Sequence, residues 1–418
     1  MELKKQEIET LRVLGQKYME YASLPVQQEK RELWRRLNRL DMQKPMFTMD
    51  QLPWNELDVD PALTCTVEQP YFRGLETQLR RTIYKWEHLP ADMVLEPYIL
   101  LDRPLGNTGY AGYGLDFVQE TRGDDPHGIA LSRRYIPQIC EPEDIEKIKT
   151  PHFVIDAALE TDILQTAQMI FDGIAPVRWR GVKLHLGLWD FISQWMGMTN
   201  CCIELMDRPE FMHAIMEKLT QATLEEIEEI NRLGIYDTNE NICHCSHTFD
   251  DRVPGADFDP AHPTTRDGWA FGLAQLFSSC SPAVTAEFEV PYMQRIFPHF
   301  GAIYYGCCEK LDDRLDILAR MPNIRKISCS PWSDREHFAA TLPKCYVMSN
   351  KPTPALLATD TFDEDAVRED LRRTIRAAKS NGLALEMLLK DVTTVRCRPE
   401  RLWRWSQIAA EETLRAAL

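Results

Sequence analysis

The sequence lacks any run of about 20 apolar residues, the length that a helix needs to cross a bilayer. Its first residues, Met1 to Glu7, are charged and lack the apolar segment of a signal peptide. We therefore predict a cytoplasmic protein without membrane contact. In a reducing compartment the 12 cysteines are expected to be thiols rather than a disulfide framework.

Positive charge is also scarce. The chain has 48 Lys and Arg against 64 Asp and Glu, a formal net charge of −16. A nucleic-acid-binding protein needs a basic surface, and docking on an anionic membrane needs one too. The composition therefore argues against both kinds of partner.

Glycine-rich phosphate-binding motifs are missing as well. No Gly-x-Gly-x-x-Gly follows an early strand-like run, and no Gly-x-x-x-x-Gly-Lys occurs. This absence disfavours a nucleotide-binding open sheet. No two Cys-x-x-Cys pairs combine into a zinc finger of the usual kind.

Two parts of the chain differ in pattern. Residues 1–74 carry apolar side chains at spacings of three and four, which predicts an N-terminal helical extension. In residues 75–418 strand-like runs alternate with helical patterns, which implies parallel strands joined by helices. The predicted strands cover 93–100, 182–188, 242–245, 302–305, 324–329, 345–348 and 383–389. We predict an α/β protein whose main domain, 75–418, is a (β/α)8 TIM barrel.

Helix boundaries also have sequence signals. Asp207 is expected to cap a helix with Pro209 in its first turn and Gly234 at its end. Thr361 and Glu364 are expected to form a capping box. A final helix is predicted after Pro399.

The first candidate site follows the predicted strand 242–245. Cys243, His244, Cys245 and His247 are of the residue types that bind zinc. On an extended segment Cys243 and Cys245 would point to the same side. The alternative is that these are small core residues beside a loop histidine.

The second candidate site follows the strand 302–305. Tyr305 and Gly306 precede the adjacent thiols Cys307 and Cys308, and the glycine permits a close backbone approach. Active sites of barrels lie at the carboxyl ends of strands, so these thiols are candidates for chemistry. The alternative is buried packing, because free cysteine is among the most buried residue types.

Charged residues on the last predicted strand form a third group. These are Glu386, Lys390 and Asp391. Burying a charged side chain in an apolar strand costs free energy unless the charge is paired or takes part in a functional site. Glu386 is either a site residue or the partner of a nearby Lys or Arg. Glu287 and Glu289 are instead expected on a solvated face.

The loop from His247 to Trp269 is long for a compact domain, which is typical of a functional loop or lid. Trp269, Phe271 and Tyr292 could line an apolar substrate wall, although aromatic residues more often belong to the core.

Three segments of the sequence resemble the uroporphyrinogen decarboxylase superfamily: 300–312, 327–334, and 390–394 followed by Pro399. The resemblance implies a (β/α)8 barrel. The decarboxylase branch has an N-terminal Gln-Ala-Gly-Arg signature that this chain lacks. The corrinoid methyltransferase branch uses His-x-Cys and a later Cys to bind zinc. The matching position here reads Tyr305-Gly306-Cys307.

The resemblance to the methyltransferase branch implies a zinc-assisted transfer of a methyl group from a small methylated substrate, for example a methoxylated one, to a corrinoid protein. His244, Cys245, Cys307 and Cys308 would hold the zinc. Tyr305 or Glu386 would protonate the leaving atom, with Asp391 as a further catalytic residue. An anaerobic O-demethylation system would fit this chemistry.

Two alternative functions stay open. One is a cofactor-free decarboxylase, and the other is a non-catalytic barrel that binds a tetrapyrrole or corrinoid. A homodimer formed through the helical extension is also compatible with the sequence.

Overall fold

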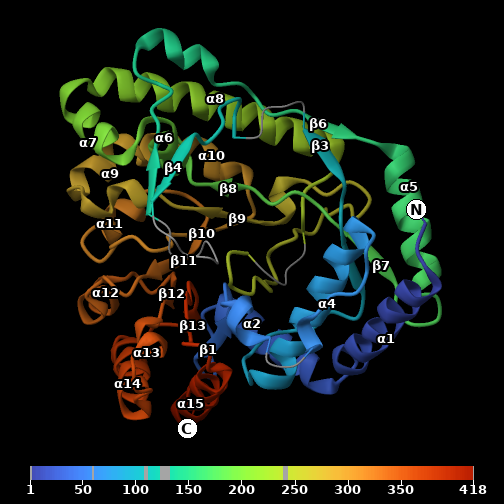
Figure 1. The fold of residues 1–418 in the computed structure, drawn as a ribbon. Coiled ribbons are helices and arrows are strands. Elements are labelled where there is room, and N and C mark those ends of the chain that lie inside the picture. The colour runs from blue at the N-terminus through green and yellow to red at the C-terminus, as the bar shows by residue number, and fades with distance from the viewer. Residues whose placement is uncertain (1, 59–60, 108–111, 123–131, 239–242, 418) are drawn as a thin grey trace.

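The computed structural model describes residues 2–58, 61–107, 112–122, 132–238 and 243–417. Its centre is a seven-stranded sheet in the order β1-β13-β12-β11-β10-β9-β8, and all neighbouring strands are parallel. The strands are β1 Met46–Met49, β8 His185–Leu186, β9 Trp269–Gly272, β10 Ala302–Tyr305, β11 Ile324–Cys329, β12 Val347–Asn350 and β13 Leu385–Leu389. Figure 1 shows them curving through the middle of the molecule.

The strand order follows the chain from β8 to β13, and the first strand, β1, then lies beside the last. This is the cyclic order of a barrel. Within the described residues no ladder joins β8 to β1, so a parallel α/β sheet is confirmed and the closed (β/α)8 barrel stays a prediction. A second parallel sheet consists of two strands only, β2 Ile99–Asp102 and β7 Val177–Arg180.

Two antiparallel pairs lie outside the central sheet. They are β3 Leu105–Asn107 with β6 Phe153–Ile155, and β4 Gln119–Arg122 with β5 Ser132–Tyr135. Short 3-10 helices cover Pro61–Leu63, Pro142–Lys147, Thr265–Asp267, Gln275–Ser279 and Phe297–His299.

Helices surround the sheet (Figure 1). The N-terminal ones are α1 Lys5–Ala22, α2 Pro25–Asn38, α3 Trp54–Leu57 and α4 Pro70–His88. Next along the chain are α5 Ala157–Ile170, α6 Leu188–Met196, α7 Met198–Asp207, α8 Pro209–Leu233, α9 Pro282–Phe288 and α10 Val290–Ile296. The last are α11 Leu315–Leu318, α12 Arg335–Thr341, α13 Ala355–Ala358, α14 Glu364–Ser380 and α15 Pro399–Ala417. None of the helices within the described ranges combines the length and the apolar character that crossing a membrane requires.

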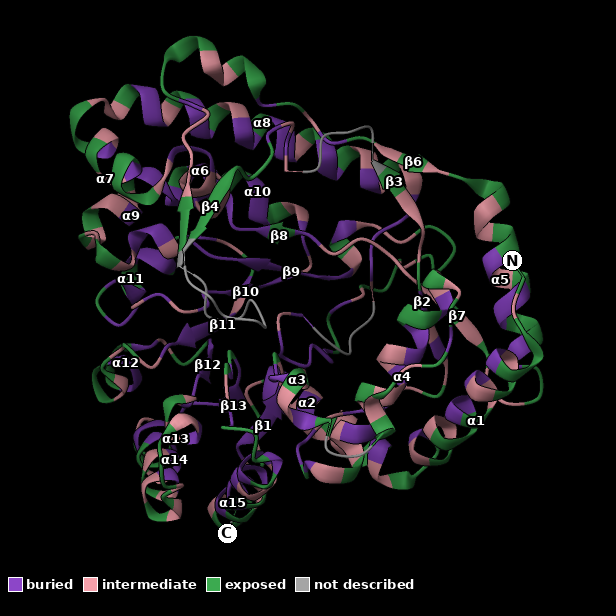
Figure 2. Cartoon of the chain, viewed as in Figure 1, coloured by how far each residue is buried: buried purple, intermediate pink, exposed green. Residues whose placement is uncertain are grey.

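The core has a main part and a smaller N-terminal part. The main part packs the sheet against its covering helices, and β1 and β9 to β13 are almost entirely buried. Figure 2 shows the burial of each residue. In the smaller part, Leu11 of α1, Phe72 of α4 and Ile163 of α5 share one apolar cluster. The expected helical extension, 1–74, also contributes β1 to the central sheet, so it is not wholly helical.

The predicted strands agree with the structure unequally. The strands 302–305 and 324–329 are confirmed as β10 and β11, whereas β12 begins and ends two residues after the predicted 345–348. Of 182–188 only His185–Leu186 is a strand, and 93–98 is irregular chain that contains Pro97. Proline has no backbone N–H to donate to a neighbouring strand, which explains why 93–98 does not form a strand.

The predicted helix caps were partly wrong. Pro209 begins α8 and Gly234 ends it in the left-handed conformation, with φ of 61°, as expected. The cap residue of α8 is Arg208 rather than Asp207, because Asp207 belongs to the end of α7. Helix α14 is capped by the Asp363 carboxylate, which accepts from the Ala366 amide, rather than by Thr361.

Candidate functional site

Three reactive side chains follow three strands of the central sheet. Cys307 follows β10, Lys351 follows β12 and Lys390 follows β13. Because these strands are parallel, their carboxyl ends lie at one edge of the sheet, where the sites of barrel enzymes are built. All three side chains are buried.

The Lys390 ammonium is the centre of this cluster. Its Nζ lies 2.8 Å from Cys307 Sγ and 3.0 Å from Asp391 Oδ2. It lies 3.4 Å from His244 Nε2 and 4.0 Å from Cys308 Sγ. The Lys390 ammonium therefore contacts four other residues that the sequence singled out: His244, Cys307, Cys308 and Asp391. We call these five residues the Lys390 cluster.

The two adjacent thiols are in different states. The two sulfur atoms are 3.4 Å apart, and Cys308 Sγ is equally 3.4 Å from Asp391 Oδ2, so its one S–H proton is shared between Cys307 and Asp391. The hydrogen bond from Cys308, together with the Lys390 charge, lowers the pKa of Cys307 despite its burial. The same hydrogen bond raises the pKa of Cys308. Cys307 is therefore the more readily ionised thiol of the pair, and Cys308 is the less readily ionised one.

Lys390 keeps its proton. Burial alone would lower its pKa, but the sulfurs of Cys307 and Cys308 and the Asp391 carboxylate raise the pKa above its ordinary value. The Lys390 ammonium donates to Cys307 Sγ at 2.8 Å, and a hydrogen bond from a charged donor is stronger than a neutral one.

His244 lies in a tight turn. The prediction of a strand at 242–245 is therefore wrong for Cys243 to Cys245. Ile242 lies outside the described residues. Cys243 and Ser246 exchange both backbone hydrogen bonds, and His244 and Cys245 have φ of 46° and 66°. The turn separates the side chains that an extended segment would have aligned.

The imidazole of His244 is fixed and neutral. It stacks on Phe271 with ring centroids 3.6 Å apart. Burial lowers its pKa, and the charges of Lys390 and Lys351 lower it further. A neutral ring offers an acceptor nitrogen, and since an ammonium only donates, His244 Nε2 accepts from Lys390.

The backbone of Cys307 is held from two sides. Its amide donates to Glu309 Oε2 at 2.7 Å, and its carbonyl accepts from the Ser328 hydroxyl at 2.8 Å. Gly306 has φ of 90°, and a Cβ there would lie 2.6 Å from Leu311 Cδ1. The expected close approach at Gly306 is thus confirmed, and Cys307 is held in a single position.

Tyr304 and Tyr305 point to opposite faces of β10, as consecutive strand residues do. The Tyr304 hydroxyl lies 2.9 Å from Ser349 Oγ and accepts from Lys351. The Tyr305 hydroxyl donates to Glu289 Oε1 at 3.2 Å. Tyr305 therefore contacts a buried carboxyl group on the far side of the strand from Tyr304.

Glu289 was expected on a solvated face, but it is fully buried. Burial raises its pKa, and the neighbouring Asp190 and Glu309 raise it further. Burial and Glu309 likewise raise the pKa of Asp190 to about 7. Glu287, in contrast, is exposed. Glu289 is the single residue between α9 and α10.

Glu386 pairs with a lysine, as one of the two sequence interpretations proposed. Its Oε2 lies 2.6 Å from Lys326 Nζ, and both side chains are fully buried. Ser246 Oγ bridges the pair at 2.8 Å from Glu386 Oε2 and 2.7 Å from Lys326 Nζ. Lys326 also lies over the rings of Trp34 and Trp269.

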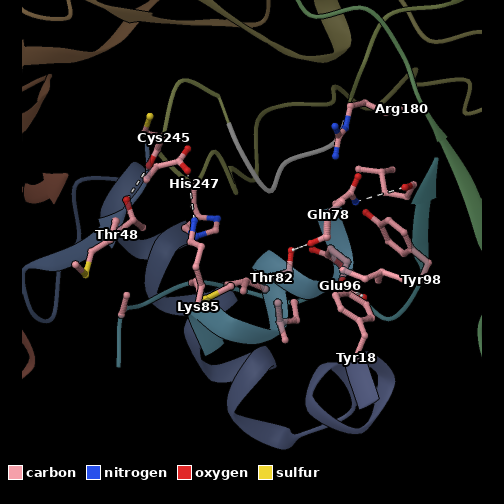
Figure 3. A pocket seen from close by; sticks show the side chains of 18 of the residues that line it. Tyr18, Thr48, Gln78, Thr82, Lys85, Glu96, Tyr98, Arg180, Cys245 and His247 are labelled. Atoms are coloured by element: carbon pink, nitrogen blue, oxygen red, sulfur yellow. Dashed lines mark hydrogen bonds and ion pairs between the residues drawn. The ribbon is translucent and has the colours of Figure 1, made fainter. Parts of the chain in front are cut away.

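Cys245 lines a cavity of about 430 Å³, a volume typical of small-molecule sites. Figure 3 shows Cys245, His247 and Thr48 on one side of it and Arg180 and Tyr98 on the other. Further lining residues are Tyr18, Asp50, Gln78, Leu79, Lys85, Leu95 and Lys183. Because Cys245 follows His244 in one turn, the cavity and the Lys390 cluster share that turn.

The loop 247–269 begins tied to the body rather than free. Asn38 of α2 donates to the Phe249 carbonyl at 2.7 Å, and Arg39 pairs with Asp251 at 2.5 Å. Trp269 and Phe271 are buried in β9, in the same apolar cluster as Cys307. Tyr292 belongs to α10 and contacts His213 instead.

The predicted metal ligands do not form a metal cage. His244, Cys307 and Cys308 meet, but around the Lys390 ammonium, and Cys245 points to the cavity. Across the described residues no group of three or more His, Cys, Asp or Glu side chains is arranged to hold a metal ion.

Sequence reasoning named Lys390 only as part of a group, and it missed Lys351. A lysine directly after an apolar strand was the available signal for Lys351. The predicted strand 345–348 ended two residues before β12 does, so Lys351 was not recognised as a strand-end residue.

Comparisons with known proteins give little direct information. No protein-family model matches the chain, and no curated protein matches it. Among solved structures, a methyltransferase from Methanosarcina mazei is 11% identical, covers 91% of this chain and 97% of its own, and has a TM-score of 0.49. A likeness at this level leaves the function to be argued from the chain's own residues.

Proposed function

We propose that this chain is a methyltransferase that takes a methyl group from a small methylated substrate at the Lys390 cluster and delivers it to a corrinoid protein. The observation that carries the proposal is the 2.8 Å contact between the Lys390 ammonium and Cys307 Sγ at the carboxyl ends of the strands. The corrinoid acceptor follows only from the sequence resemblance.

The chemistry that supports the proposal is that of a thiolate. A thiolate is a strong nucleophile toward saturated carbon, and a nearby cation keeps it ionised at neutral pH. Lys390 supplies that cation, and Glu309 and Ser328 fix the backbone of Cys307. The cavity beside Cys245 has room for a small substrate. A reduced corrinoid would supply a strongly nucleophilic acceptor for the methyl group.

Zinc assistance fits the kinds of donor present but not their arrangement. Thiolate, imidazole and carboxylate are ordinary zinc ligands. The position between them is taken by Lys390 Nζ, which lies within 3.4 Å of Cys307, Asp391 and His244. An ammonium and a zinc ion exclude each other there, so we assign no step to zinc.

The predicted proton donors contact other partners. The Tyr305 hydroxyl is engaged by Glu289, and Glu386 by Lys326 and Ser246. The proposal therefore assigns no proton transfer to either residue. Asp391 remains in the cluster, where it accepts from Cys308 and forms an ion pair with Lys390.

The proposal is tested by methyl transfer from a panel of methylated donors to free cob(I)alamin, which stands in for the corrinoid protein. Cys307→Ser should lower the transfer rate at least about a hundredfold, because a serine hydroxyl is not ionised at neutral pH. Cys140→Ser, which changes an exposed thiol, is the matched control and should keep the rate.

Circular dichroism and thermal melting would show that both variants fold. Undiminished transfer by a folded Cys307→Ser protein would contradict the proposal. A shift in the cobalamin spectrum without turnover by the unmodified protein would instead support the non-catalytic binding function.

A further inference from the structure

The charges on the wall of the cavity beside Cys245 balance. Among the described residues, three carboxylates and three cations line it: Asp50, Glu96, Asp237, Lys85, Arg180 and Lys183. Glu96 and Arg180 are held by partners outside the lining, at 2.9 Å and 2.8 Å. The other four form two ion pairs within the lining, Lys85 with Asp50 and Lys183 with Asp237. The wall therefore offers both signs of charge to one ligand.

Both ion pairs of the cavity are loose. Lys85 Nζ lies 3.5 Å from Asp50 Oδ1, and Lys183 Nζ lies 3.6 Å from Asp237 Oδ2. Charge-assisted hydrogen bonds are about 2.7–2.9 Å long, so each partner can take up a further charged group. The side chains of Lys85 and Lys183 are only 16% and 19% exposed. A charge that is so little exposed gains more from a new partner than a charge in bulk water.

The pair of Lys85 and Asp50 lies next to the Lys390 cluster. Asp50 directly follows β1 and accepts from the Cys245 thiol. Figure 3 shows Lys85 reaching from α4 toward the turn that carries Cys245. Past Cys245 lie the ammonium groups of Lys390 and Lys351. A group that Asp50 holds is therefore the part of a ligand nearest to that turn.

The rest of the wall on this side is mainly apolar. The hydroxyls of Thr48, Thr82 and Tyr18 donate to backbone carbonyls at 2.7 Å, 2.8 Å and 2.9 Å, so their protons are engaged. The apolar lining consists of Met49, Leu79, Leu89, Val94, Leu95 and Ile99. A ligand that fits this wall has a small head group with both charges and an apolar body.

We infer that this cavity binds an N-methylated α-amino acid with an apolar side chain, whose carboxylate contacts Lys85 and whose methylated ammonium contacts Asp50. In an α-amino acid both charged groups are attached to one carbon, which suits a pair whose charges are 3.5 Å apart. The inference rests on the proposed function and names its substrate class.

Such a donor suits a site to which no proton donor is assigned. The electron pair of the reduced corrinoid forms the new bond to the methyl carbon while the bond from that carbon to nitrogen breaks. The electron pair of the broken bond stays on nitrogen, so the ammonium leaves as a neutral amine and no proton moves.

The inference is tested by calorimetric titration of the purified full chain with three probes of similar shape. N-methyl-L-leucine carries both charges, its amide carries only the positive charge, and 4-methylpentanoate carries only the negative charge. N-methyl-L-leucine should bind at least about tenfold more tightly than either of the others, because each of those forms only one of the two charged contacts.

Two variants should reverse the preference. Lys85→Met leaves Asp50 without its lysine, so it should weaken N-methyl-L-leucine at least about tenfold and bind the amide best. Asp50→Asn should bind 4-methylpentanoate best for the converse reason. Lys17→Met removes an exposed lysine that pairs with Glu87 of the same helix α4, and it should keep the affinities unchanged. Thermal melting shows that the variants fold, and the comparison of the three probes on the unmodified protein does not depend on any variant.

Several results would overturn the inference. These are equal affinity for N-methyl-L-leucine and 4-methylpentanoate, no binding of any probe at millimolar concentration, and a loss of affinity in Lys183→Met but not in Lys85→Met. Methyl transfer to cob(I)alamin from other donors, without preferential binding of N-methyl-L-leucine, would overturn the inference and leave the proposed function standing. Preferential binding with the expected reversal, but without methyl transfer from any donor, would support the binding site and contradict the proposed function.

Discussion

At the scale of single residues, the contrast between Cys307 and Cys308 is decided by what each sulfur contacts. Both thiols belong to one dipeptide, yet the pKa of Cys307 is lowered and that of Cys308 is raised. Cys307 accepts from Lys390, and the single S–H proton of Cys308 is shared between Cys307 Sγ and Asp391 Oδ2, each 3.4 Å away. A sequence shows that two cysteines are adjacent, but not which one becomes the nucleophile.

This contrast gives a prediction for Cys308→Ala. Loss of the thiol donor, the largest influence that lowers the pKa of Cys307, should raise that pKa. Alkylation of Cys307 by iodoacetamide should therefore slow severalfold near pH 7 and approach the unmodified rate at higher pH, where both proteins carry the thiolate.

The measurement is a pH profile of alkylation with peptide mapping. The second vicinal pair, Cys201 and Cys202 in α7, offers a matched control, because Cys202→Ala should leave the profile of Cys307 unchanged. An identical profile for Cys308→Ala and the unmodified protein would contradict the assigned hydrogen bond.

At the scale of elements, a buried ion pair links β11 to β13 across β12. Lys326 and Glu386 are fully buried and 2.6 Å apart. Breaking a buried pair by removing one partner leaves an uncompensated charge, which costs about 3–5 kcal/mol. Lys326→Met should therefore lower the free energy of unfolding by about that amount.

Urea unfolding measures this effect, and the double variant Lys326→Met with Glu386→Leu should recover most of the loss. The exposed pair Arg373–Glu336 is the control, because Arg373→Met should cost at most about 1 kcal/mol. A Lys326→Met protein as stable as the unmodified one would show that the pair is not buried as described.

Elements were predicted well where their signal is local. The apolar patterns at 302–305 and after Pro399 predicted a strand and a helix, and the structure has β10 and α15 there. The 243–245 segment was wrong because its turn depends on left-handed residues that are neither glycine nor asparagine, for which a sequence gives no warning. The same error misplaced Cys245, which lines the cavity rather than the Lys390 cluster.

At the scale of the whole molecule, pH acts on stability through buried carboxyl groups. Glu226 of α8 accepts from the Tyr113 hydroxyl at 2.8 Å, which ties residues near 113 to the body. Burial raises the pKa of Glu226 from 4.5 to about 7. Between these values the folded protein binds more protons than the unfolded chain, so stability falls as pH rises through this window.

Glu226→Gln should remove this part of the pH dependence and stabilise the protein near pH 8, by an amount on the order of 3 kcal/mol at most. Thermal melting from pH 4 to pH 8 measures it. Glu217→Gln in the same helix is the control with the opposite sign, because the Arg295 hydrogen bond lowers the pKa of Glu217. An unchanged slope in Glu226→Gln would contradict the prediction.

The sequence by itself determined the alternation of strands and helices, the parallel pairing, and the candidacy of the thiols after β10. These follow from periodicity and from short-range turn chemistry, which are local properties of the chain. Only the tertiary structure decided that Lys390, 83 residues after Cys307, places its ammonium between thiolate, imidazole and carboxylate. The reason is that parallel strands bring distant strand ends to one edge, and which side chains then touch depends on register and backbone conformation.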